Sequence, residues 1–147
     1  MKPLIAALFA TAAPLFALSP DALADSYDYS KPWSVIEGER SPMADPHMRS
    51  VIVNRVDDEN ASHGSYAAYG YAVVAPGTHK VTIDLPRRKG FHMATQNTFD
   101  LETKPCTRYI VAAELKTVTT QEWTPIVRRE ERIGECEAKF KMASGAK

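Results

Sequence analysis

Hydrophobic and polar residues alternate strictly in the stretch HKVTIDLP, residues 79–86. Val81, Ile83 and Leu85 fall on one side of an extended chain, and the residues between them are polar. A period of two with a single apolar side is typical of a β-strand that covers a core with one face and meets solvent with the other. The pattern therefore predicts a half-buried antiparallel strand.

The same alternation recurs towards the C-terminus. Phe99 and Leu101 alternate with acidic residues in NTFDLETK, which predicts another half-buried strand. The stretch ECEAKFKMA, residues 135–143, alternates as well. Its Glu, Ala and Lys content would suit a helix, but the strict alternation favours a strand.

Apolar residues follow one another without interruption from Tyr109 to Ala113. Such a run is typical of a central strand that is covered on both faces. Shorter segments rich in β-branched and aromatic residues, at 50–56 and 69–75, predict further strands between turns that contain Pro and Gly. About seven short strands without a clear amphipathic helix predict an all-β fold, an antiparallel β-sandwich.

The first 24 residues have the pattern of a cleaved signal peptide. A positive start precedes an uncharged apolar stretch, and Ala22-Leu23-Ala24 fits the small residues that signal peptidase requires. We expect residues 25–48, which contain three prolines, to form an extended lead-in that docks through Trp33, Val35 and Ile36. Residues 49–147 then form the sandwich domain, and the mature protein is periplasmic or secreted.

The charges balance, with 18 Lys and Arg against 18 Asp and Glu. A neutral chain argues against nucleic acid as a partner, because nucleic-acid-binding proteins usually carry a clear basic excess. After the signal peptide, no segment approaches the ~20 apolar residues of a transmembrane helix, so we expect a mature protein that does not span the membrane. No motif in the sequence indicates a cofactor.

Cys106 and Cys136 are the two cysteines of the chain. An even pair in an exported protein predicts a disulfide bond. A redox or metal-binding thiol pair is the alternative, but the CxxC spacing that would suggest it is absent.

Several of these strands resemble PEGA-type modules, which are small β-sandwich domains of the bacterial envelope. The corresponding residues are Val51, Val53 and Asn54, then Pro76, Gly77, His79, Val81 and Ile83, then Gly90 and Phe91, and finally Phe99 and Leu101. More loosely, the pattern is similar to transthyretin-like sandwiches of bacterial surface proteins. The resemblance covers about half of the mature chain and lacks the tetrapeptide that names the family. It implies a sandwich fold with an accessory or binding role, and it brings no catalytic residues.

Aromatic residues are the stronger candidates for binding. Tyr66, Tyr69 and Tyr71 lie close together in the sequence, and Trp123 is also available. Tyr69 and Tyr71 share one face of a strand, where exposed rings could bind a glycan or a protein of the cell envelope. The alternative is that these rings belong to the core or its rim.

Copper binding is the second functional hypothesis. Its candidate ligands are Met43, His47, Met48, His92 and Met93. Thioether and imidazole together suit copper in an exported protein. Against this hypothesis, no close pair of histidines has the spacing of a metal site.

An enzymatic activity is not expected. A nucleophile elbow of the G-x-S-x-G type is absent, and oxidised cysteines cannot act as nucleophiles. Among the carboxylates, Glu114 interrupts an apolar strand. It is therefore either exposed at an edge or buried beside an arginine such as Arg108 or one of those at 128–132.

Overall fold

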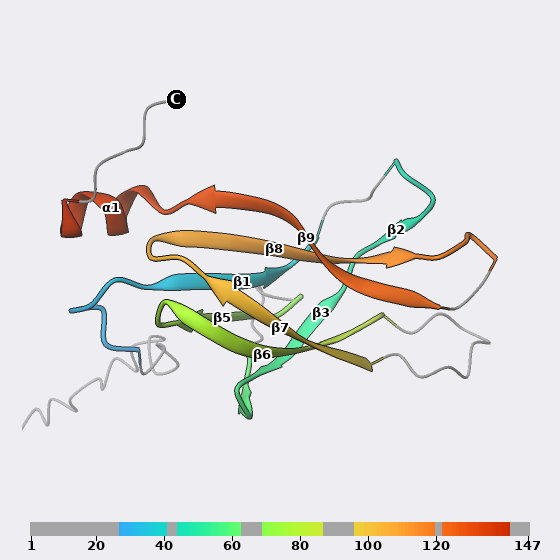
Figure 1. The fold of residues 1–147 in the computed structure, drawn as a ribbon, viewed down its shortest axis with the longest axis horizontal. Helices are drawn as coiled ribbons and strands as arrows, with labels where there is room; N and C mark the ends of the chain where they lie inside the picture. Colours follow the sequence, from blue (N-terminus) through green and yellow to red (C-terminus); the bar gives the residue numbers. More distant parts are fainter. Residues whose placement is uncertain (1–26, 41–43, 63–68, 87–95, 120–121, 142–147) are drawn as a thin grey trace, which may run out of the picture.

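The computed structural model describes residues 27–40, 44–62, 69–86, 96–119 and 122–141 (Figure 1). These residues form the all-β fold that the sequence predicts, with the addition of one short helix. The strands are β1 (Ser34–Gly38), β2 (Met48–Arg49), β3 (Ile52–Val56), β4 (Glu59–Asn60), β5 (Tyr71–Val74), β6 (Gly77–Asp84), β7 (Gln96–Thr103), β8 (Thr107–Leu115) and β9 (Trp123–Arg132). The helix is α1 (Gly134–Phe140).

The strands form two sheets that lie in two layers (Figure 1). In the larger sheet, β8 pairs with β9 along one edge, and with β1 and then β2 along the other, while β5 pairs with β1. The smaller sheet has the order β4-β3-β6-β7. Most pairs are antiparallel, but β1 and β8 run parallel, which differs from the purely antiparallel sheet that the sequence predicts.

One hydrophobic core fills the space between the sheets. Ile36 and Val111 from the larger sheet pack in it against Val53, Val81 and Ile83 from the smaller sheet. The alternation along residues 79–86 is confirmed, because Val81 and Ile83 are fully buried. The run from Tyr109 to Ala113 is confirmed as a central strand, since all five residues are buried and β8 is paired along both edges.

The predicted lead-in contributes directly to the larger sheet. β1 lies within residues 25–48 and is hydrogen-bonded on both sides, to β5 and to β8. Trp33 and Ile36, two of the expected docking residues, are buried. The segment predicted as a lead-in is therefore part of the sandwich.

The predicted strand at residues 135–143 is wrong, because Gly134–Phe140 is the helix α1. Glu, Ala and Lys favour a helix. In addition, Cys136 and Phe140 are four residues apart, so they share one helical face and pack into the same hydrophobic cluster. A spacing of four residues also fits a period of two, and for this reason the alternation favoured a strand. In the described part of the chain, no helix has the length and apolar character needed to cross a membrane.

His79 joins two turns of the smaller sheet. Its Nδ1 lies 2.5 Å from Asp57 Oδ2, and its Nε2 lies 2.6 Å from the carbonyl oxygen of Ala75. The other oxygen of Asp57 accepts a hydrogen bond from the backbone N–H of Lys80. Burial alone would raise the pKa of the Asp57 carboxyl, but these two hydrogen bonds and the charge of the imidazolium outweigh it and hold the pKa below its ordinary value.

The lowered pKa of Asp57 predicts a loss of stability in acid. The carboxyl has a pKa of about 3.9 in the unfolded chain, so its contribution should be complete above about pH 5 and disappear as the pH falls through the lower, folded-state pKa. Asp57→Asn keeps an oxygen that can accept from Lys80 but removes the charge. We expect the difference in the free energy of unfolding between wild type and Asp57→Asn, measured with urea, to shrink between pH 6 and pH 3. A difference that is constant over this range would contradict the assignment.

Candidate ligand-binding groove

An open groove of 710 Å³ lies on the outer face of the larger sheet. Its floor comes from β1, β5 and β8, and its end comes from α1 and the residues before β1. The lining residues are Tyr29, Trp33, Val35, Glu37, Arg40, Tyr71, Val73, Arg108, Ile133, Glu135 and Lys139. Segments that are far apart in the sequence therefore meet at one surface.

Strand register explains why the residues of the floor face the same way. Val35 on β1 lies opposite Val73 on β5 and Arg108 on β8. Two residues further along β1, Glu37 lies opposite Tyr71. Directly opposed residues project from the same face of a sheet. Since Ile36 points into the core, its neighbours Val35 and Glu37 must point outwards, into the groove.

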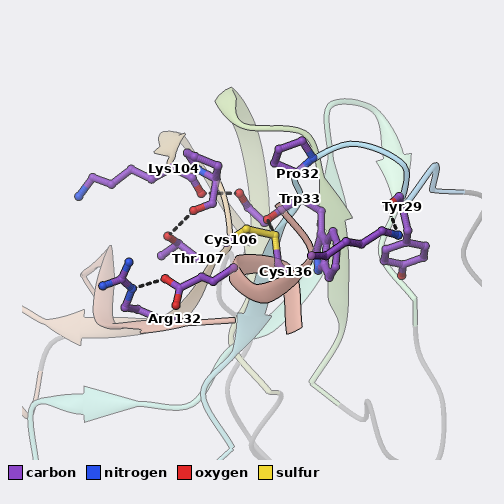
Figure 2. The surroundings of a disulfide bond; sticks show 12 residues. Tyr29, Pro32, Trp33, Lys104, Cys106, Thr107, Arg132 and Cys136 are labelled. Atoms are coloured by element: carbon purple, nitrogen blue, oxygen red, sulfur yellow. Dashed lines mark hydrogen bonds and ion pairs between the residues drawn. A yellow bond between two sulfur atoms is a disulfide. The ribbon is translucent and has the colours of Figure 1, made fainter. Parts of the chain in front are cut away.

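The disulfide bond fixes the end of the groove (Figure 2). Cys106 and Cys136 are joined as the sequence predicts, with their Cα atoms 5.2 Å apart, and both are buried. The backbone N–H of Cys106 donates to the carbonyl oxygen of Trp33 at 2.7 Å, and its own carbonyl oxygen accepts from Ile133 at 2.8 Å. The turn between β7 and β8 thus holds both the segment before β1 and the start of α1.

Aromatic rings pack around this junction in a second hydrophobic cluster. Trp33 lies against the disulfide, and its ring meets Phe140 of α1 and Tyr29 in edge-to-face contacts with centroids 6.1 and 5.1 Å apart. Tyr27 packs on the other side of Tyr29 and donates its hydroxyl to the carbonyl oxygen of Pro32. Burial, with the charge of Asp28, raises the pKa of Tyr27 above its ordinary value.

Lys139 connects α1 to the rim of the groove. Its Nζ donates to the carbonyl oxygen of Tyr29 at 2.7 Å and lies 5.9 Å from the centroid of the Phe140 ring. The contact fixes an ammonium group beside the partly exposed ring of Tyr29. The end of the groove therefore combines an aromatic surface with a positive charge.

The floor of the groove carries a three-membered ion pair. Arg40 Nη2 lies 3.0 Å from Glu37 Oε1, and Arg108 Nε lies 3.9 Å from Glu37 Oε2. A single carboxylate on β1 thus orients two guanidinium groups, one from β8 and one from the residues that follow β1.

A second buried carboxylate lies next to the groove. Arg128 Nη1 lies 2.6 Å from Glu39 Oε2, and Arg129 Nη2 lies 3.8 Å from the same oxygen. The β8–β9 register shifts here, because Ile110 pairs with Arg129 while Val111 pairs with Val127. Arg128 is therefore the extra residue of a β-bulge. A regular strand would place two consecutive arginines on opposite faces. The bulge instead lets both of them reach the same carboxylate.

The predicted aromatic residues do not form one platform. Tyr71 lines the groove, whereas Tyr69 precedes β5 and is not among the lining residues. Trp123 is the first residue of β9, where it pairs with Leu115 at the C-terminal end of β8, and it packs against the main core. Tyr66 lies outside the described residues.

The copper hypothesis remains a prediction. His47 is exposed and Met48 is half-buried on β2, while Met43, His92 and Met93 lie outside the described residues. Within the described ranges, no group of three or more His, Cys, Asp or Glu side chains is arranged to hold a metal ion.

Sequence reasoning missed most of the polar residues of the groove. Glu37, Arg108 and Lys139 carry no motif, and their meeting depends on strand pairing that the sequence does not state. Glu114 was the carboxylate expected at an edge or beside an arginine. It is exposed, and the buried carboxylate beside arginines is Glu39.

Comparison of the chain with protein-family models, with curated proteins and with solved structures finds no match in any of the three. The resemblance to PEGA-type modules therefore remains a prediction from the sequence.

Proposed function

We propose that this protein is an exported, non-enzymatic β-sandwich of the periplasm or cell envelope that binds a glycan in the groove of its larger sheet. The observation that carries the proposal is the composition of the groove. The rings of Tyr29 and Tyr71 lie in the same cavity as the charged groups of Glu37, Arg108 and Lys139. Aromatic faces suit the apolar faces of sugar rings, and oriented polar groups suit their hydroxyls.

A glycan fits this surface better than a protein segment. Extended peptides usually bind along a free sheet edge, where backbone groups are available for hydrogen bonds. The groove instead crosses the face of the sheet, where β1 has its backbone bonds to β5 and β8. Over β1, recognition therefore goes through side chains, and those that line the groove include rings and charged groups.

Two features support export. The first 24 residues have the pattern of a signal peptide, and Cys106 and Cys136 form a buried disulfide. Disulfides of this kind persist in oxidising compartments. The binding role is proposed without a catalytic step, because Glu37, one of the two carboxylates that line the groove, is already paired with Arg40 and Arg108.

A glycan array with the mature, oxidised protein tests the proposal. We expect binding to a restricted set of envelope-type oligosaccharides. Tyr29→Ala should weaken this binding about fivefold, which corresponds to the loss of one ring contact of roughly 1 kcal/mol. Because 39% of Tyr29 is exposed, the substitution should leave the fold intact.

Val118→Ala provides the matched control. Val118 is also an exposed large hydrophobic residue, but it lies in the connection between β8 and β9 and does not line the groove. Its replacement should leave glycan binding unchanged. Absence of glycan binding by wild type, or equal losses for both variants, would overturn the proposal.

A further inference from the structure

On the outer face of the larger sheet, two carboxylates lie below the guanidinium groups that they contact. The side chains of Glu37 and Glu39 are only 16% and 2% exposed. The four arginines that contact them are between 35% and 52% exposed; they are Arg40, Arg108, Arg128 and Arg129. Among the lining residues of the groove, Arg40, Arg108 and Lys139 carry positive charge and Glu37 and Glu135 carry negative charge. The groove therefore has a small positive excess, although the whole chain is formally neutral.

The buried carboxylates have a second effect, because they hold the guanidinium groups in place. Arg40 and Arg108 lie near different oxygens of Glu37, so one carboxylate attracts both guanidinium groups to the same part of the groove. Part of each guanidinium remains exposed and can still donate hydrogen bonds. A pair of oriented guanidiniums is the arrangement that proteins use to bind carboxylates, since the planar groups match the two oxygens.

The aromatic end of the groove lies within the same cavity as these arginines. Tyr29 and Lys139 come from the end, and Arg40 and Arg108 come from the floor. A ligand that spans the groove would therefore meet a ring surface, an ammonium group and two guanidinium groups.

From this arrangement we infer that the ligand is a saccharide that carries carboxylate groups, such as a chain of uronic acids. Its carboxylate binds the exposed donors of Arg40 and Arg108, and a sugar ring lies against Tyr29 or Tyr71. This inference rests on the proposed glycan-binding function and adds the charge of the ligand. An acidic peptide would satisfy the arginines, but it would leave the ring surface without a matching partner.

Calorimetric titration with matched saccharides tests the inference. The probes are a panel of oligouronates and their methyl esters, which keep the rings and remove the charge. We expect the free acids to bind about tenfold more tightly than the esters, since hydrogen bonds to an ionised carboxylate are stronger than those to a neutral ester. The preference should decrease at high salt, because ions screen exposed charges.

Two arginine variants locate the effect. Arg108→Gln should weaken binding of the acid about tenfold and leave binding of the ester unchanged. Arg55→Gln is the matched control, because Arg55 is an exposed arginine on β3 of the other sheet. It should change neither affinity.

Equal affinity for acids and esters would overturn the carboxylate inference and leave glycan binding intact. Binding of neither saccharide would overturn both proposals. Tight binding of a polyglutamate peptide without binding of any saccharide would also overturn both, and would assign the surface to an acidic protein partner.

Discussion

Replacing Gly38 with alanine should destabilise the protein by about 3 kcal/mol, at the upper end of the range for overpacked sites. Gly38 is buried at the end of β1, against the backbone of the segments that lead into β3 and β5. A β-carbon there would lie 2.6 Å from the carbonyl oxygen of Tyr69 and nearer still to that of Val51. Both neighbours are backbone atoms, so they cannot move aside without shifting a strand.

Gly134→Ala is the matched control for this prediction. Gly134 is the first residue of α1, and a β-carbon at this position would meet nothing within 4 Å. The same chemical change should therefore stabilise the protein by about 0.4–1 kcal/mol, because alanine restricts the unfolded chain. Unfolding by urea measures both values. Equal stability of Gly38→Ala and wild type would show that these backbone segments do not pack against Gly38 as described.

Removal of the disulfide should have a comparable effect. The bond closes a loop between residues 30 apart in the sequence, and its loss should lower the free energy of unfolding by about 3.5 kcal/mol. The double variant Cys106→Ala/Cys136→Ala tests this value without leaving a free thiol. α1 has seven residues and is too short to be stable alone, so we expect it to detach from Trp33.

The disulfide also predicts a local change that can be separated from global unfolding. At low denaturant the double variant should keep its β-sheet circular dichroism, while the fluorescence of the buried Trp33 shifts to longer wavelength. Reduction of wild type should reproduce both results, and reductant should not affect the double variant. A loss below about 1 kcal/mol would show that the bond does not act as the chain-entropy argument requires.

The parts of the fold that depend on local pattern could be predicted from the sequence. The alternation at Val81 and Ile83 and the apolar run on β8 report how each strand is covered, and neighbouring residues contain this information. The parallel pairing of β1 with β8 joins segments about 70 residues apart, and no local pattern encodes it. The helix α1 was predicted as a strand because the spacing of Cys136 and Phe140 fits a period of two and a helical turn equally well.

The groove was harder to predict than the fold for the same reason. Tyr71 was recognised as an aromatic candidate, but its partners Glu37 and Arg108 lie on other strands. The buried Glu39 depends on a β-bulge at Arg128, and the sequence RREER reads as an ordinary solvated strand. Charge counted along the chain is balanced. Only burial shows that Glu37 and Glu39 are hidden while the arginines that contact them are exposed.

The central claim is that the outer face of the larger sheet, between α1 and the floor formed by β1, β5 and β8, is the binding surface of the protein. An amide NMR titration of the oxidised protein with oligouronates tests it most directly. We expect saturable shifts at Val35, Glu37, Tyr71 and Arg108, and none along β6 and β7 of the smaller sheet. Shifts confined to the smaller sheet, or no shifts at all, would contradict the claim.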